Sequence, residues 1–553
     1  MTLVERRIGL LFAFFLLLLG LAAARATWMV TIRGGSLSHA AASQQVVDQV
    51  VPARRGTILD RRGEPLAVSD PADDISATPY LVKDPAGVAK QLAPLLGMTE
   101  AQVVTKLVRK HTGFVYLTRR LPAAAADKVK ALAIAGIDVT PGSQRTYPRG
   151  LLAAQVVGST NLEGEGLFGL EYGQNRVLHG RDGKRSSVLD GGRDAIQVHD
   201  ALRSSPGQSL RLTLDAELQQ RTEDVLAGVG RTYRPKGATA IVMDPKTGAV
   251  LAMANWPRID ANHPGQAPPY ATQNKAVNFP YEPGSTFKAF TVAGALQDGK
   301  VTPETKFTLA PQIQVADRVI KESHARGWET LTTGEILAQS SNVGAITIGQ
   351  RLHAKRFDYW VRRFGFGKPT GLDFPGEEQG LALPLKKYSG SSMGNLPIGQ
   401  GELVTPIQMA TAYAAIANGG VLRKPHLIDA VDGQLVPLPV GRRVISKQTS
   451  AQLRAMLEGV FRPGGTASEV SIPGYVLAGQ TGTANKVDPG ASEYSKTRFI
   501  ASFVGFAPAK HPKLLVSVVV DEPQGAIYGG EVAAPAFGEI AKFALPYLAI
   551  APN

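Results

Sequence analysis

The sequence contains a serine and a lysine placed so that they could perform acyl transfer. Pro283 and Gly284 are turn residues, and the apolar run after them predicts a buried helix that begins near Ser285. Lys288 lies one turn further on, and residues i and i+3 of a helix share a face. A serine hydroxyl is a poor nucleophile until a base removes its proton. Burial favours the neutral form of a lysine amine, which could act as that base. The positive field of the helix N-terminus would favour negative charge developing on Ser285.

A second polar stretch could complete this pair. Ser340 and Asn342 interrupt a mostly helical segment predicted for residues 333–352. We expect Ser340 to hydrogen bond to the amine of Lys288 and to pass protons, and Asn342 to bind a substrate amide. The alternative is a polar patch on a helix surface, because Ser and Asn are usually exposed. Taken alone, Ser285 with its lysine would equally fit a helix-capping serine and a surface lysine.

A third stretch, residues 476–483, has the composition of a strand and ends in a polar run. Gln480, Thr481, Gly482 and Thr483 make up that run, and we predict that they bind substrate. A glycine within a strand allows another backbone to approach closely, so we expect Gly482 to admit the substrate backbone.

These stretches need a sheet to hold them. Residues 238–243 and 250–255 form a predicted hairpin, because two apolar runs flank a Pro-Lys-Thr-Gly turn. Further strands are predicted at 498–506 and 514–520. With the third polar stretch they make an antiparallel sheet of about five strands, and a C-terminal helix at 535–547 would pack on it.

Length and composition limit the classes of protein to which the chain could belong. A chain of 553 residues is long enough for two or three domains. Cysteine is absent, which excludes a disulfide framework and a thiolate metal site. The 60 basic and 46 acidic residues give a formal charge of +14, which favours anionic partners such as membrane headgroups, wall polymers or nucleic acid. The sequence contains no nucleic-acid motif, so we predict no nucleic-acid partner.

The N-terminal segment indicates that the protein is attached to a membrane. Residues 8–24 are uncharged and almost wholly apolar, and two arginines precede them. A run of this length can just span the hydrocarbon core, and the arginines place its N-terminal side in the cytoplasm. We therefore predict a cytoplasmic tail at 1–7, a transmembrane anchor at 8–30 and an exported remainder. A cleaved signal peptide is the alternative, because the Ala-Arg-Ala at 24–26 resembles a cleavage site.

The rest of the chain divides near residue 210, after a Ser-Ser-Pro-Gly run. Residues 31–210 contain no catalytic cluster, and we predict an elongated α+β pedestal there, with short helices around a strand near 113–118. The charged stretch at 53–67 has the pattern of a hairpin, and its charges alone predict a solvated one. Residues 211–553 would form the second domain and do the chemistry.

Two polar segments near the predicted site lack periodicity. They are residues 311–330 and 484–497. We expect both to be mobile loops, and the second to shape substrate access because it joins the motif strand to its neighbour.

Together the three polar stretches resemble the signature of penicillin-binding proteins and active-site-serine β-lactamases, which is Ser-x-x-Lys, then Ser-x-Asn, then a Lys-Thr/Ser-Gly strand. The chain looks like a class B penicillin-binding protein over nearly all its length. It has no glycosyltransferase-like segment between the anchor and the pedestal, which argues against class A. The short hairpin and the small size of its pedestal resemble the division-specific branch more than the elongation-specific one. Further family landmarks are RGTILDRRGEPLA (55–67), RTYP (145–148), GLFGLE (166–171), VMDPKTGAVLAMAN (242–255), EPGSTFK (282–288), IGQGELVTPIQMATAYAAIANGG (398–420) and YGGEVAAPAF (528–537).

The resemblance implies a D,D-transpeptidase that cross-links peptidoglycan stem peptides through a serine acyl-enzyme. Ser285 would be the nucleophile and Lys288 its general base. The backbone N–H groups of Ser285 and Thr483 would form the oxyanion hole, and such donors typically contribute a few kcal/mol each. β-Lactams would acylate Ser285, and no metal or organic cofactor would be needed.

The resemblance also implies a place and partners. The protein would be a single-pass protein of the bacterial cytoplasmic membrane, with its bulk outside the cytoplasm, and would act in cell division, septum formation and cell shape. A membrane glycosyltransferase and other division proteins would be its partners.

The third stretch departs from the family pattern, because Gln480 stands where the family has lysine. Glutamine can donate a hydrogen bond but carries no charge, and a charge-assisted bond is roughly twice as strong as a neutral one. Three interpretations follow. A nearby cation, Lys486 or Arg498, could compensate; the enzyme could be slow or poorly inhibited by β-lactams; or the protein could be a silent scaffold of a wall-synthesis complex. A soluble carboxypeptidase or β-lactamase is a further alternative, against which the pedestal and anchor argue.

Overall fold

The chain folds into two units, each built from separate stretches of sequence. The computed structural model describes residues 3–31, 46–109, 112–189, 195–488, 490 and 493–552. The first unit comprises Met1–Arg54, Pro71–Gln144 and Gly180–Gly207, and the second comprises Arg55–Asp70, Arg145–His179 and Gln208–Asn553. The residues of the expected pedestal are therefore shared between both units, because the chain leaves and re-enters each of them.

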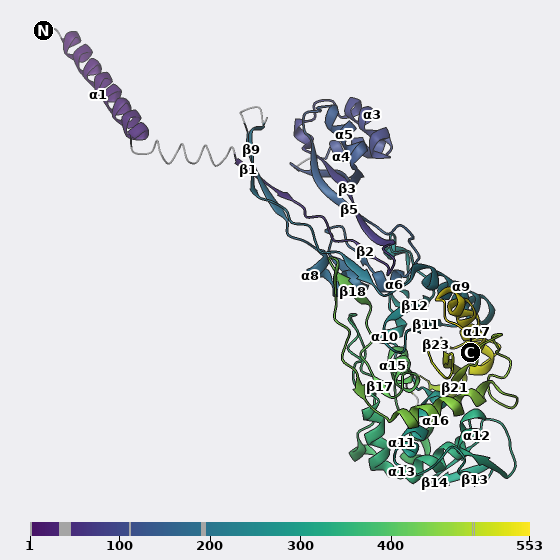
Figure 1. Ribbon diagram of the computed structural model, residues 1–553. Helices are drawn as coiled ribbons and strands as arrows, with labels where there is room; N and C mark the ends of the chain where they lie inside the picture. Colours follow the sequence, from purple (N-terminus) through teal and green to yellow (C-terminus); the bar gives the residue numbers. More distant parts are fainter. Residues whose placement is uncertain are drawn as a thin grey trace. The chain divides into compact units, whose positions relative to one another are not determined.

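Helix α1 (Leu3–Thr31) is apolar along most of its length (Figure 1). Its segment Arg6–Thr31 has a mean hydropathy of 2.3, and none of it is buried against other parts of the protein. At 1.5 Å per residue these 26 residues extend about 39 Å, more than the roughly 30 Å of a hydrocarbon core. The helix fits a single-pass membrane anchor and begins earlier than the predicted span at 8–30.

The first unit contains an α+β fold around strands β4 (Val115–Pro122) and β5 (Ile137–Thr146). Both strands pair with β3 (Pro65–Ala77), whose later residues belong to this unit. The predicted helices around a strand near 113–118 are present. They are α3 (Pro85–Leu96), α4 (Glu100–Leu107) and α5 (Ala123–Ala131), and they share one small core with the strands. Strands β1 (Val46–Val51), β8 (Gly183–Leu189) and β9 (Ala195–Leu202) form a separate sheet.

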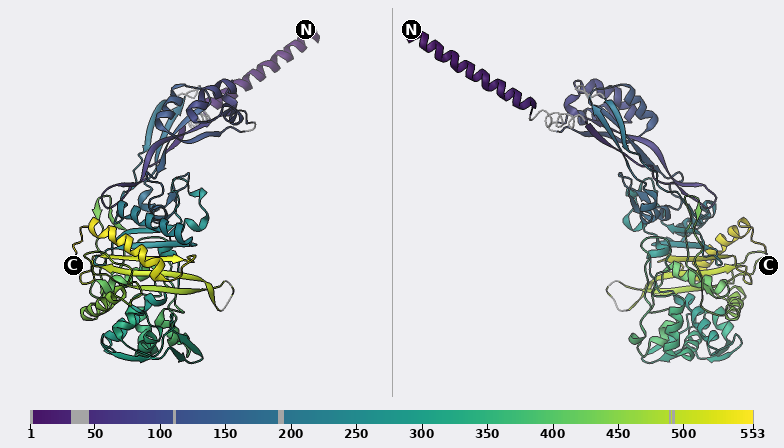
Figure 2. Two further views of the ribbon diagram at one scale, coloured as in Figure 1. Left: turned by 90° about the vertical axis from the view of Figure 1, so that its right-hand side faces the viewer. Right: turned by 60° about the vertical axis from the view of Figure 1, so that its left-hand side comes forward.

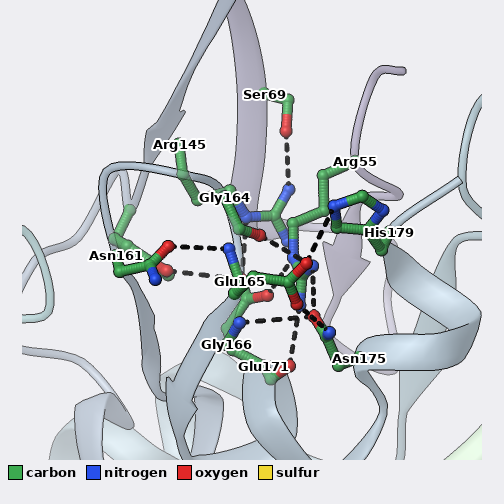
Figure 3. Close-up of polar contacts among 11 residues, drawn as sticks. Arg55, Ser69, Arg145, Asn161, Gly164, Glu165, Gly166, Glu171, Asn175 and His179 are labelled. Atoms are coloured by element: carbon green, nitrogen blue, oxygen red, sulfur yellow. Dashed lines mark hydrogen bonds and ion pairs between the residues drawn. The ribbon is translucent and has the colours of Figure 1, made fainter. Parts of the chain in front are cut away.

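Three of the sequence landmarks meet at a buried ion network in the second unit (Figure 3). The carboxylate of Glu171 accepts from Nε of Arg55 at 2.5 Å and from Nε of Arg145 at 2.7 Å. All three side chains are at most 5% exposed. Arg55 also donates to the carbonyl of Gly164 and to Oδ1 of Asn175. The prediction of a solvated hairpin at 53–67 was wrong for Arg55, because its charge is neutralised by a partner more than a hundred residues away.

The second unit is organised around a five-stranded antiparallel sheet (Figure 2). In the central strand β23, Val516 and Val518 pack into one hydrophobic cluster while Leu515 and Val519 pack into another, as the two-residue repeat of a strand requires. Both faces are therefore buried. The strands, in spatial order, are β12 (Val250–Trp256), β11 (Gly237–Met243), β23 (Leu514–Asp521), β22 (Tyr494–Ala507) and β21 (Ala478–Val487).

Helices cover the two faces of this sheet. On one face lie α9 (Ala216–Tyr233) and α17 (Gly529–Tyr547), whose apolar residues share a cluster with Val516 and Val518. On the other lie α11 (Lys288–Gln297) and α15 (Pro406–Ala417). The prediction of about five strands with a C-terminal helix packed on them is confirmed. Helix α17 starts at Gly529, before the predicted 535, so Pro535 lies inside it.

The two segments expected to be loops contain strands. Strands β14 (Gln312–Val315) and β15 (Arg318–Lys321) pair as a hairpin within 311–330, and β16 (Glu329–Thr332) follows. Ile313 and Val315 pack against Ile398 and its neighbours, an apolar alternation too short to stand out in the sequence. Strands β21 and β22 continue through most of 484–497.

Candidate active site

The first motif forms a turn that opens directly into helix α11. A 3-10 turn covers Gly284–Phe287, and α11 starts at Lys288, so Ser285 lies at the helix N-terminus as predicted. Gly284 has a φ of +55°, and a Cβ there would lie 3.1 Å from the carbonyl of Thr483. The glycine thus allows the turn to adopt a left-handed conformation against the motif strand. Ser285 is partly exposed and lines a cavity.

Lys288 is completely buried, and its amine is held by the second motif. Nζ donates to the carbonyl of Ser340 at 2.6 Å, to Oδ1 of Asn342 at 2.7 Å and to Oγ of Ser340 at 3.2 Å. Burial lowers the pKa of Lys288 from its ordinary value to about 7, while the nearby Glu322 carboxylate raises it and the Arg326 guanidinium lowers it. The amine is therefore half neutral near pH 7, as a general base requires.

The second motif is a tight break between two helices. Helix α12 (Thr333–Ala338) ends just before it, and α13 (Asn342–Arg363) starts within it, with Ser341 as N-cap. Ser340 lies between them with a φ of +58°, a left-handed conformation that a serine rarely adopts. Its conformation brings both its carbonyl and its hydroxyl to the amine of Lys288. Asn342 also donates from Nδ2 to the carbonyl of Lys321, 3.0 Å away.

The third motif lies on edge strand β21, beside the first. Alternate residues of a strand point to opposite sides, and here Thr481, Thr483 and Asn485 line the same cavity as Ser285. The hydroxyls of Thr481 and Thr466 lie 2.8 Å apart, and Oγ1 of Thr483 accepts from the N–H of Gly529 at the start of α17. The structure thus brings all three predicted stretches to one cavity of about 560 Å³.

Gln480 lies on the other side of the strand and is fully buried. Its Nε2 donates to the carbonyl of Leu337 at 3.0 Å, and its Oε1 accepts from the N–H of Thr481. It is therefore held by backbone groups. The candidate compensating cations are also paired, since Lys486 contacts Asp521 and Glu522, and Arg498 contacts Asp488. These acids offset the positive charge of both.

Gly482 has a packing role that the sequence did not reveal. A Cβ at this position would lie 2.3 Å from Oγ of Ser502 and 2.9 Å from the carbonyl of Pro283. The glycine is required because strand β21 lies against the turn that carries Ser285. The close backbone approach expected at Gly482 comes from the protein itself.

Sequence reasoning missed several residues of the cavity. Glu322, His324, Thr466 and Tyr528 all line it, and the rings of His324 and Tyr528 lie 5.2 Å apart. Two signals were available: the polar segment around Glu322 precedes the second motif, and Tyr528 begins the landmark at 528–537. Among the residues that the structure describes, no three His, Asp or Glu side chains group in a way that could hold a metal ion.

Comparisons with known proteins agree with this geometry. Residues 238–542 match the family described as "Penicillin binding protein transpeptidase domain", and residues 50–212 match the "Penicillin-binding Protein dimerisation domain". Fold and motifs together thus define a penicillin-binding protein with a transpeptidase domain. The chain belongs to the class B penicillin-binding proteins of the division type.

Individual relatives align along most of their length. The chain is 34% identical to peptidoglycan D,D-transpeptidase FtsI of Escherichia coli K12, covering 99% of this chain and 92% of the relative. It is also 34% identical to penicillin-binding protein PbpB of Mycolicibacterium smegmatis, covering 93% and 86%. Penicillin-binding protein 3 of Mycobacterium tuberculosis, solved in its apo form, aligns with a TM-score of 0.71 and 30% identity, covering 91% and 98%.

Proposed function

We propose that the protein is a peptidoglycan D,D-transpeptidase whose nucleophile is Ser285 and whose general base is Lys288. The observation that carries this proposal is the buried amine of Lys288, one helical turn from Ser285 at the wall of the cavity. Neutral Lys288 would take the Ser285 hydroxyl proton as Oγ attacks the carbonyl between the two terminal D-alanines. The protonated amine would then give that proton to the departing D-alanine.

The second half of the reaction reverses these roles. The amine of a neighbouring stem peptide would attack the ester carbonyl on Ser285, and its proton would return through Lys288 to the leaving Oγ. Ser340 supports this transfer, since its hydroxyl lies 3.2 Å from Nζ. We assign substrate amide binding to Asn342 and the oxyanion hole to the backbone N–H groups of Ser285 and Thr483, both of which line the cavity.

We assign recognition of the peptide by the motif strand to its cavity face. Thr481 and Thr483 present their side chains there, while Gln480 and Gly482 support the strand from the opposite side. β-Lactams would acylate Ser285 as substrate mimics. Related structures support this, because penicillin-binding protein 3 of M. tuberculosis has been solved in complexes with aztreonam and with ampicillin.

We further propose that α1 crosses the bacterial cytoplasmic membrane with its N-terminus in the cytoplasm. The basic residues Arg6 and Arg7 precede its apolar core, which supports this orientation. The folded units, including the transpeptidase domain assigned to 211–553, would then lie outside the cytoplasm and work with a membrane glycosyltransferase and other division proteins at the septum.

A second candidate function is a scaffold with a disabled site, and the neutral, backbone-bound Gln480 favours it. Acylation of the full-length chain in detergent by a fluorescent penicillin separates the two. Labelling of wild type that disappears in Ser285→Ala supports the enzyme. A wild type that stays unlabelled, while Gln480→Lys reacts, supports the scaffold. If neither protein reacts, the three motifs do not form a working site.

A further inference from the structure

A short segment after strand β15 contacts the second motif from one end. The carboxylate of Glu322 accepts three hydrogen bonds, from Oγ of Ser341 at 2.6 Å and from the backbone N–H groups of Asn342 at 2.7 Å and Val343 at 3.2 Å. These donors form the first turn of α13, where free N–H groups and the helix dipole favour a negative charge. Glu322 thus fastens the residues that follow Ser340.

Four residues later, Arg326 contacts the same motif from the other end. Its guanidinium donates to the carbonyl of Gln339 at 2.9 Å and to the side-chain Oε1 of Gln339 at 3.1 Å, and it pairs with Glu329 at 3.1 Å. The Arg326 side chain is 18% exposed, so solvent screens it little. Gln339 directly precedes Ser340. The left-handed Ser340 is therefore held on both sides by side chains of opposite charge.

These two side chains are also the charged groups that act on Lys288. Glu322 favours the charged amine and Arg326 favours the neutral one, while the amine's direct contacts, Ser340 and Asn342, are neutral. The motif strand adds no charge from its buried face, because position 480 is glutamine. Of the residues that the structure describes on this side of the site, Arg326 is the cation that opposes protonation of Lys288.

We propose that Glu322 and Arg326 are positioning residues that hold the turn at Ser340, and with it the contacts of Ser340 and Asn342 to the Lys288 amine, and that Arg326 supplies the positive charge that Gln480 lacks. This inference rests on the proposed function, because it concerns the base that activates Ser285. Lys288 must be neutral to accept the hydroxyl proton. Burial favours the neutral amine, the Glu322 carboxylate at the helix N-terminus opposes this, and the cation held by the turn offsets the carboxylate without occupying the substrate cavity.

The test is the pH dependence of acylation by a fluorescent penicillin, measured on the full-length chain in detergent. A neighbouring charge typically moves a pKa by about one unit or more. Arg326→Gln should therefore move the inflection of the rate upward by about one pH unit, which lowers the rate at pH 6 roughly ninefold and at pH 9 by little. Glu322→Gln should move the inflection downward and raise the rate at pH 6 about fivefold.

Three single variants and one double variant complete the design. Arg326→Lys keeps the charge and should keep the inflection. Gln480→Lys should lower the inflection in the wild-type background and restore it toward the wild-type value when combined with Arg326→Gln. Arg462→Gln removes an exposed cation from the same unit, whose side chain is 70% exposed and paired with Glu458, and should change nothing.

The outcomes separate this inference from the proposed function. Opposite shifts in Arg326→Gln and Glu322→Gln support the inference, because loss of a merely structural contact would lower the rate by the same factor at every pH. A uniform loss, or an unchanged inflection in a labelled Arg326→Gln, overturns it and leaves Ser285 as nucleophile. If Arg326→Gln does not fold, an inflection unmoved by Gln480→Lys overturns it instead. An unlabelled wild type overturns both.

Discussion

The pH dependence of Ser285 acylation is a direct test of Lys288 as the proposed base. Lys288 is 0% exposed, and burial lowers its pKa from 10.5 to about 7. This pKa shift disfavours the charged amine by roughly 5 kcal/mol, at about 1.36 kcal/mol per pKa unit. The neutral fraction is then about 9% at pH 6, 50% at pH 7 and 91% at pH 8, whereas an ordinary lysine would be only about 0.3% neutral at pH 8.

The acylation rate should follow this fraction. We expect the second-order rate constant for a fluorescent penicillin to rise about tenfold between pH 6 and pH 8 and to level off above pH 8. The assay is stopped-time labelling of the full-length chain in detergent, with Ser285→Ala as the blank and thermal melting at each pH to confirm folding. A rate that climbs tenfold per pH unit through pH 9 would refute the reasoning, because it would mean that Lys288 titrates as an exposed amine.

Three further predictions concern stability and packing. Glu171→Gln should lower the free energy of unfolding by about 3–5 kcal/mol, since it leaves two buried arginines without their partner, and a lower melting temperature would show it. Gly482→Ala should slow acylation roughly 10- to 100-fold, because the new Cβ pushes strand β21 away from the Ser285 turn. Burial raises the pKa of Glu402, whose two oxygens have no hydrogen-bond partner in the described structure. Glu402 therefore stabilises the fold fully only below its ordinary pKa of 4.5, and less as the pH rises. The melting temperature of Glu402→Gln should equal that of wild type near pH 4 and exceed it near pH 8. The difference in the free energy of unfolding between the two proteins should grow by up to about 1.4 kcal/mol per pH unit.

The first two of these predictions each have a matched control, and the third is tested by its dependence on pH. Glu539→Gln removes a carboxylate from an exposed ion pair with Arg221 and should change stability by less than about 1 kcal/mol. Gly228→Ala introduces the same methyl group in helix α9, where only the far end of Arg231 comes within 4.0 Å, and should leave acylation unchanged. Equal effects of target and control, or a Glu402→Gln melting difference that does not vary with pH, would contradict the respective argument.

Much of the architecture follows from local patterns in the sequence. The apolar run after Arg7 predicts a membrane-spanning helix because about 20 residues must bury their backbone in lipid. The alternation and turn residues at 238–255 predict the hairpin that the structure contains. The turn before Ser285 and the apolar residues after it predict that this serine begins a helix with Lys288 one turn on, as observed. These features depend on neighbours within a few residues.

The three-dimensional roles of other residues depend on partners far along the chain. The charged stretch around Arg55 has the composition of a solvated turn, but the Arg55 side chain is buried and its charge is neutralised by Glu171. Gly482 has the pattern of a substrate-facing glycine, yet Pro283 and Ser502 occupy the space beside it. Gln480 departs from the family motif, and only the fold shows that its amide is held by Leu337.

The sequence by itself determined which residues could do the chemistry, because nucleophile, base and strand each have a local pattern. Only the tertiary structure decided what surrounds Lys288, the proposed base. The charges that act on Lys288 come from a polar segment without helical or strand periodicity, and a Coulomb interaction depends on distance in space. Folding brings Glu322 and Arg326 to the Ser340 turn, and burial there moves the pKa of Lys288 to about 7.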